Sequence, residues 1–230
     1  MGTRRRLTKR QLRQDKFVSS TFELAQFVQQ HARRVAMGLI VLGVAIGGAF
    51  YYLNYREHRE KRAAELLAAG VLAYEAGNYP LAISDLEKVQ SEYPGTTVGG
   101  EAALLLSDTH YRAGNNEEAR RVLLEFTARH GKKSPLSYQA YLLLGKAQEN
   151  LEDFDEAAKA YLSAEESARF DYQRIEAVIG AARAFSRAEK DQEAIEEYQS
   201  LLDHYPDSPE AQRAELLLAE SEARTQAGAK

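Results

Sequence analysis

The chain has 230 residues, of which 28% are charged and none is cysteine, and its formal net charge is −4. Without cysteine it can hold no disulfide, thiolate nucleophile or thiolate metal site. The charge is unevenly divided. Residues 1–34 carry nine Lys and Arg against two Asp and Glu, net +7, whereas residues 54–230 carry 21 against 32, net −11. The second part is long enough for a sizeable core and too acidic to favour nucleic-acid binding.

An uncharged apolar run over residues 35–53, VAMGLIVLGVAIGGAFYYL, separates the two parts. At about 1.5 Å per residue, this run reaches roughly 28 Å as a helix, close to the hydrocarbon core of a bilayer at about 30 Å. Arg33 and Arg34 abut its start, and basic flanks are retained in the cytoplasm. The sequence therefore predicts a single-pass membrane helix, with a cytoplasmic N-terminus and an extracytoplasmic remainder.

A cleaved signal peptide is the alternative for this run. Its apolar region normally spans about 7–15 residues behind a short basic segment. Here 34 residues precede a longer run, which favours an uncleaved anchor. Gly43 and Gly47 form a small-xxx-small match that permits close packing of membrane helices, so they are candidates for homodimer contacts. Glycine is also common in membrane helices, and the dimer stays a hypothesis.

The basic tail, residues 1–34, contains a candidate amphipathic helix. Ser20 and Glu23 fit a capping box, and Phe17, Leu24 and Val28 fall on roughly one side of a short helix. With Lys and Arg around it, such a helix should lie in the anionic inner interface of the membrane. On the other side of the span, the segment 54–62 lacks Pro and Gly and is expected to continue the span as a helical linker.

One element recurs four times in the acidic part. A tight turn leads into a helix whose first buried residue is alanine, and the turn positions 77, 114, 152 and 189 lie 37, 38 and 37 residues apart. The helix before each turn carries a small residue at one register, and a large residue follows each alanine by four positions. These are Gly70, Ser107, Gly145 and Ala182 for the small residue, and Leu86, Leu123, Tyr161 and Tyr198 for the large one.

This pattern resembles the tetratricopeptide repeat. The resemblance implies an all-α fold, in which the predicted N-terminal single transmembrane helix is followed by a right-handed tetratricopeptide-like α-solenoid of four helix pairs. A cap helix is expected within residues 209–230. The four repeats cover residues 63–208, as 63–96, 100–133, 138–171 and 175–208.

The repeats also depart from the family pattern. Glu152 and Glu189 stand where the turn usually has glycine, repeats two and three lack the terminal proline, and the usual tryptophan is absent. An ordinary helical bundle with an alanine and leucine core is the alternative. Four copies in register favour the repeat, because a single helix pair cannot bury its own apolar face and needs stacked neighbours.

In arrays resembling this one, the first helix of each pair lines the concave face. The resemblance implies that a polypeptide binds there, on an apolar floor of leucine and isoleucine with two tyrosines and mixed charges at the rim. The alternative is that some of these leucines pack between helices and never meet a ligand. The candidate groove residues are Leu67, Val71 and Tyr74; Leu104, Asp108, Tyr111 and Arg112; Leu142, Lys146 and Glu149; and Ile179, Arg183 and Arg187.

The sequence contains no recognisable catalytic or metal-binding motif. The five histidines are scattered, none forms an i, i+4 pair, and there is no His-Glu-x-x-His motif. Residues 131–134, GKKS, lack the upstream glycine of a phosphate loop. We therefore expect no enzymatic activity, no cofactor, no metal and no nucleic-acid partner. The expected partners are the lipid bilayer and other proteins: a membrane complex, a chaperone or an unfolded polypeptide.

The chain has a short basic inner tail, one span and an outward array, and this layout is similar to that of the bacterial ancillary subunit family of the Sec translocon. That family is thought to pass emerging chains to envelope chaperones, and the resemblance implies a bacterial inner membrane with the repeats on its periplasmic side. The first hypothesis is thus a non-enzymatic membrane-anchored scaffold that binds polypeptide in its concave face and couples secretion to chaperones. The second is an organiser of envelope assembly or cell division. The third is a transmembrane sensor or regulator acting through the basic inner tail, in particular residues 4–10.

Overall fold

The computed structural model describes residues 29–228, which form nine α-helices and one short 3-10 segment, with no strand. The predicted all-α class is confirmed for this part of the chain. The amphipathic helix expected around residues 17–28 lies outside the described residues. The chain divides into two compact units, residues 1–57 and 58–230, and the boundary falls inside the first described helix.

That helix, α2 (Ala32–Glu75), contains the predicted span and runs without interruption through residues 54–62. Over residues 36–58 it is exposed along its whole circumference, including Ile40, Val44 and Phe50. A contiguous exposed apolar surface of this kind is typical of a protein–protein or membrane interaction site. Among the described residues, α2 is the one helix long and apolar enough to cross a membrane. A Cβ added at Gly43 or Gly47 would meet nothing within 4 Å.

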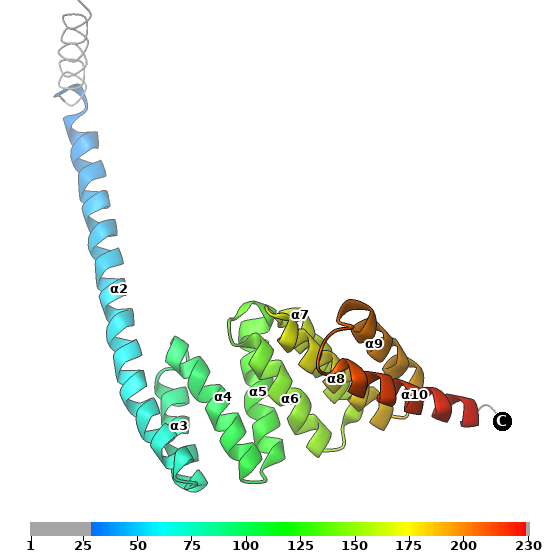
Figure 1. The fold of residues 1–230 in the computed structure, drawn as a ribbon. Helices are drawn as coiled ribbons and strands as arrows, with labels where there is room; N and C mark the ends of the chain where they lie inside the picture. Colours follow the sequence, from blue (N-terminus) through cyan, green and yellow to red (C-terminus); the bar gives the residue numbers. More distant parts are fainter. Residues whose placement is uncertain (1–28, 229–230) are drawn as a thin grey trace, which may run out of the picture. The chain divides into compact units, whose positions relative to one another are not determined.

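From residue 58 onward the helices form the repeat solenoid, in which each helix from α3 to α10 packs against the next in sequence (Figure 1). The first helices of the pairs are the end of α2, then α4 (Thr97–Arg112), α6 (Ser137–Asn150) and α8 (Asp171–Arg187). The second helices are α3 (Tyr79–Glu92), α5 (Asn116–His130), α7 (Phe154–Ser167) and α9 (Asp191–His204). A 3-10 turn, Gly131–Lys133, follows α5, and α10 (Ala211–Gly228) closes the series.

All four turns within the pairs contain one residue in the left-handed region. Gly77 and Gly114 have φ of 72° and 81°, and Glu152 and Glu189 have φ of 59° and 61° at the corresponding positions. A side chain in this conformation costs about 1–2 kcal/mol. Repeats three and four therefore keep the family's turn geometry although they lack its glycine.

The core is built from the small and large residues that the repeat pattern pairs. Leu86, Leu123, Tyr161 and Tyr198 are each at most 1% exposed. A Cβ built on Gly70 would lie 2.8 Å from Leu86 Cδ2. A glycine at this register therefore lets the second helix approach the first, as the sequence pattern predicted.

Helix α10 repeats the register of α8 with an offset of 37 residues, so that Ala214 takes the buried place of Ala177. Its outer face differs. On α8 the face packed on α9 carries Ile175, Val178, Ala182 and Phe185. The corresponding α10 positions are Gln212, Glu215, Ala219 and Glu222, all exposed. Helix α10 thus resembles the first helix of a fifth pair, with a polar face in place of an apolar one.

Candidate peptide-binding groove

Three adjoining cavities follow one another along the first helices of the repeats. The N-terminal cavity, about 410 Å³, lies between α4 and α6 and includes Tyr74. The central cavity, about 330 Å³, lies deeper between the same two helices, and Leu123 of α5 forms part of its wall. The C-terminal cavity, about 240 Å³, lies between α6 and α8 and includes Arg213. Asp108 and Leu143 line the first two cavities and Lys146 lines the last two, so the three form one continuous groove.

The first and second repeats are joined by a hydrogen-bonded bridge at the groove surface. The Tyr74 hydroxyl donates to Asp108 Oδ2, and Arg112 Nε donates to the same oxygen at 2.9 Å. The Arg112 guanidinium also lies 5.4 Å from the centre of the Tyr74 ring. Burial and the hydrogen bond to Asp108 both raise the pKa of Tyr74. The phenol is therefore a neutral donor at neutral pH.

The third and fourth repeats are joined by a second, more buried bridge. Arg183 donates from Nε to Glu149 Oε1 at 2.9 Å and from Nη2 to Oε2 at 2.8 Å, while the Tyr161 hydroxyl donates to Oε2 at 2.7 Å. Burial acts to raise the pKa of Glu149, but the Arg183 and Tyr161 hydrogen bonds outweigh it and hold the pKa below its ordinary value. A bidentate pair with a third donor fixes the relative position of α6 and α8.

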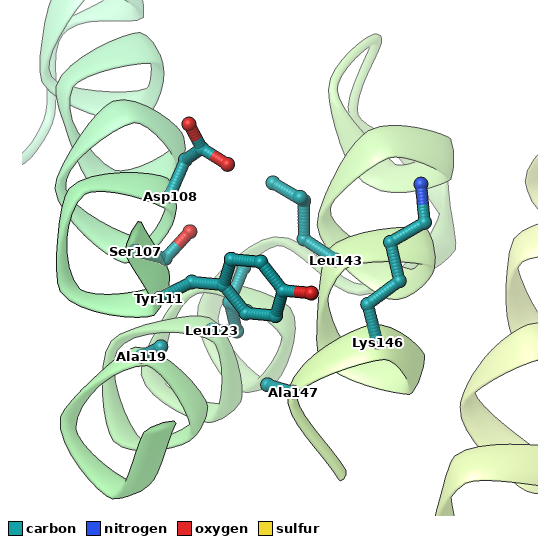
Figure 2. Close-up of a pocket in the computed structure, with 8 residues that line it drawn as sticks. All are labelled: Ser107, Asp108, Tyr111, Ala119, Leu123, Leu143, Lys146 and Ala147. Atoms are coloured by element: carbon teal, nitrogen blue, oxygen red, sulfur yellow. The ribbon is translucent and has the colours of Figure 1, made fainter. Parts of the chain in front are cut away.

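The corresponding pair between repeats two and three, Tyr111 and Lys146, forms no such bridge. Among the described residues, no hydrogen bond or ion pair joins these two side chains. The pairs at the equivalent positions, Tyr74 with Asp108 and Glu149 with Arg183, are both hydrogen-bonded. Lys146 Nζ instead lies 3.4 Å from Glu176 Oε1. Figure 2 shows Tyr111 extending from α4 across the central cavity towards α6, with Lys146 on the opposite wall.

The candidate groove residues fall into three groups by exposure. Leu104 and Leu142 are only 4% and 7% exposed, so they belong to the hydrophobic core and contribute at most the deepest part of the cavity walls. Tyr111, Arg112 and Arg187 are exposed, with Arg187 lying over the Phe154 ring at 4.3 Å. The remaining candidates are half-buried, except for the buried Glu149: Leu67, Val71, Tyr74, Asp108, Lys146, Ile179 and Arg183.

Several groove residues were not expected from the sequence. Leu143 lines both the N-terminal and the central cavity, and Tyr172 and Arg213 line the C-terminal one. The exposed Tyr172 ring stacks on Phe170 with centroids 5.7 Å apart. Extending the repeat offset by 37 residues beyond Ile179 leads to Leu216 on α10, which is 70% exposed. This extension of the repeat offset is the feature of the sequence that could have indicated a contribution of α10 to the groove, because the cap helix continues the register of the first helices.

No group of three or more His, Cys, Asp or Glu is placed to hold a metal ion within residues 29–228. The arrangement is instead suited to contacts with polypeptide. It offers apolar cavities, aromatic rings at the rim and charged side chains of both signs, which are the elements of a protein-recognition surface.

The family models agree with this architecture. A model described as tetratricopeptide repeat-like domain matches residues 25–178, and a second, described as tetratricopeptide repeat, matches residues 176–208. The chain belongs to the tetratricopeptide repeat family, and its fold is that of a protein-interaction scaffold. A search of curated protein sequences gives no significant match.

Solved structures show the same fold at low sequence identity. Nearly identical TPR-like repeats from Podospora anserina are 17% identical, with a TM-score of 0.61 over 74% of this chain and 89% of that one. A tetratricopeptide repeat protein from Parabacteroides merdae is 14% identical, with a TM-score of 0.60 over 71% and 61%. MamA from Desulfovibrio magneticus is 19% identical, with a TM-score of 0.52 over 80% and 95%.

Proposed function

We propose that this protein is a non-enzymatic scaffold, anchored by α2 in a bacterial inner membrane with its repeats on the outer face, whose groove binds segments of other polypeptides. The observation that carries the proposal is the continuous line of three cavities along α4, α6 and α8. In a repeat array the first helices present such an extended surface to partners.

The anchor is supported by two independent features. The exposed surface of α2 over residues 36–58 is apolar up to its aromatic end, where Phe50, Tyr51 and Tyr52 are exposed. Amphipathic rings favour the interface between lipid and water. The excess of Lys and Arg before the span supports a cytoplasmic N-terminus. Within this layout, we propose that the partner is a secreted or envelope polypeptide, so that the scaffold couples secretion to envelope chaperones.

Orientation can be tested with single cysteines, because the native chain has none. Ser91→Cys, on the exposed side of α3, should be labelled by a membrane-impermeant maleimide in intact spheroplasts. Thr3→Cys, in the basic tail, should be labelled only after the membrane is opened. Labelling of Thr3→Cys alone in intact spheroplasts would invert the proposed topology.

Binding in the groove can be tested by photo-crosslinking in native membranes. Tyr111 is the better position for the crosslinker, because the more deeply buried Leu104 and Leu142 would report on the core. With p-benzoyl-phenylalanine replacing Tyr111, we expect capture of defined polypeptides. The control is the same replacement at Leu124, which is exposed on α5 and lines none of the three cavities.

The identity of the captured chains decides the role. Translocon subunits, chaperones or many unrelated nascent chains, captured from position 111 and not from 124, support coupling of secretion. One or two defined envelope proteins would replace this role by a dedicated assembly function. Equal capture from both positions would contradict the groove as the binding site.

A further inference from the structure

The central cavity lies at the interface of repeats two and three, and at the corresponding interface one repeat later an aromatic side chain fills the space between the helices. At the interface of repeats three and four, the Tyr161 ring lies between two glycines. A Cβ built on either Gly145 or Gly180 would lie 2.7 Å from a ring carbon of Tyr161. The ring is 1% exposed, and its hydroxyl donates to Glu149 beside Arg183.

At the interface of repeats two and three, Leu123 occupies the place of Tyr161. A leucine has neither the aromatic ring nor the hydroxyl, and the space beyond it is left open as the central cavity of about 330 Å³. Two wall positions are similar, since Ala147 stands for Ala184 and Lys146 for Arg183. Two others differ, since Ser107 stands for Gly145 and Leu143 for Gly180, so side chains form the walls of the central cavity where glycines contact the Tyr161 ring. A cavity of about 150 Å³ is sufficient for a benzene ring. The central cavity therefore has room for a phenol ring inserted from outside.

The polar groups at this cavity also suit a phenol and a neighbouring carboxylate. Tyr74 and Arg112 both use Oδ2 of Asp108, and within the described residues Oδ1 accepts no hydrogen bond. Lys146 lies on the opposite wall, with only a long contact of 3.4 Å to Glu176. A phenol hydroxyl can donate to Asp108, and an acidic residue beside it can pair with Lys146.

We propose that the central cavity is the anchor pocket of the groove, and that it takes a tyrosine side chain from an extended partner segment in which an acidic residue lies next to the tyrosine. This inference rests on the proposed function and names the chemistry of its partner. The partner's ring lies beyond Leu123, against Leu143 and Ala147, at the interface that corresponds to the one Tyr161 fills, and so completes an interface that the chain itself leaves open.

The test uses the full chain in lipid nanodiscs, with methyl-labelled leucine and alanine observed by NMR. The probe is the tripeptide acetyl-Glu-Tyr-Glu-amide, and the comparison is acetyl-Glu-Ala-Glu-amide. The tyrosine peptide should shift the methyl signals of Leu123, Leu143 and Ala147 saturably. The alanine peptide should bind at least about tenfold more weakly, because it buries no ring. Equal binding of both peptides, or no saturable shift, would overturn the proposal.

A cavity-filling variant locates the binding. Ala147→Leu places its added methyl groups in the central cavity and should abolish the shifts, whereas Leu124→Ala, at an exposed position of α5 that lines none of the three cavities, should leave them unchanged. Far-UV circular dichroism checks that both variants fold. If Ala147→Leu folds and still binds the tyrosine peptide, the pocket is elsewhere.

The two proposals fail differently. If crosslinking from position 111 captures defined partners but the two tripeptides bind equally well, the scaffold function is supported and the proposal of a tyrosine pocket is contradicted. If the tyrosine peptide binds selectively but no polypeptide is captured in membranes, the tyrosine pocket is supported and the proposed scaffold function is contradicted.

Discussion

The interface between repeats three and four and the one between repeats two and three are built from corresponding positions on corresponding helices, but they differ in how they are filled. In the former, Tyr161 fills the space between the helices and Glu149 binds Arg183 across it. In the latter, Leu123 leaves a cavity, and Tyr111 and Lys146 remain apart. The comparison shows that a repeat array can keep its backbone geometry while one interface is tightly packed and its neighbour is open to a ligand.

The largest effect is expected from removing the ring that fills the packed interface. Tyr161→Ala should lower the free energy of unfolding by about 3–5 kcal/mol, because it opens a large cavity and removes a donor to Glu149. Thermal unfolding of the full chain in detergent, followed by far-UV circular dichroism, measures the change. Tyr111→Ala, at the open interface, should cost less than about 1 kcal/mol. Equal losses would contradict the difference between the interfaces.

A smaller effect is expected from breaking the Glu149 bridge. Glu149→Gln leaves Arg183 with a neutral acceptor and should cost about 1–3 kcal/mol at neutral pH, measured by the same unfolding experiment. The folded-state pKa of Glu149 lies below its ordinary value. Its stabilisation is therefore fully present above the unfolded pKa, at about 4.3, and is lost as the pH falls through the folded pKa. The variant should lack this part of the acid dependence.

The turns allow a comparison between the glycine-containing and glutamate-containing repeats. Glu152→Gly and Glu189→Gly should each stabilise the fold by up to about 1 kcal/mol, because both residues have positive φ. The matched controls are Gly77→Ala and Gly114→Ala, which should destabilise by about the same amount. The change in melting temperature relative to the unsubstituted protein measures the effect of each of the four variants. A loss of stability in both glycine variants would show that the glutamate side chains contribute contacts that outweigh the strain.

The smallest effect concerns His110 on α4, whose two ring nitrogens are buried without a hydrogen-bond partner among the described residues. Burial lowers its pKa, although the carboxylates of Glu118 and Glu87 act in the opposite direction. The unfolded chain then binds a proton more readily than the folded one, so stability should fall as the pH drops below about 6.5. Unfolding at pH 7.5 and 5.5 should differ by on the order of 1 kcal/mol, and His110→Leu should reduce the difference.

Much of the fold was predictable because repeated local patterns determine it. The alanine after each turn and the large residue four positions later identify the buried face of each second helix, and Leu86, Leu123, Tyr161 and Tyr198 are all buried. The left-handed turns at Glu152 and Glu189 were less apparent, because the residue type there opposes the conformation. Packing of the following helix overrides that local preference.

The groove was less predictable than the repeats. The register placed Leu104 and Leu142 on the concave face, but each packs against its neighbours and is largely covered. Which residues remain open depends on the volumes of side chains from three helices at once. Leu123 is smaller than Tyr161, whereas Ser107 and Leu143 are larger than Gly145 and Gly180. The size of the central cavity therefore depends on three positions, and each difference has a meaning only when the positions are known to be equivalent. The contribution of Arg213 depends on α10, which was expected only to cover the end of the array.

The polar outer face of α10 also constrains how copies of this chain associate. End-to-end growth of a solenoid into a filament requires an apolar face on the terminal helix that the next unit can cover. Glu215 and Glu222, which replace Val178 and Phe185 of α8, would have to give up their hydration in such a contact, together with Gln212. A contact through this face of α10 would therefore carry a desolvation penalty, which a contact through the exposed apolar surface of α2 would not.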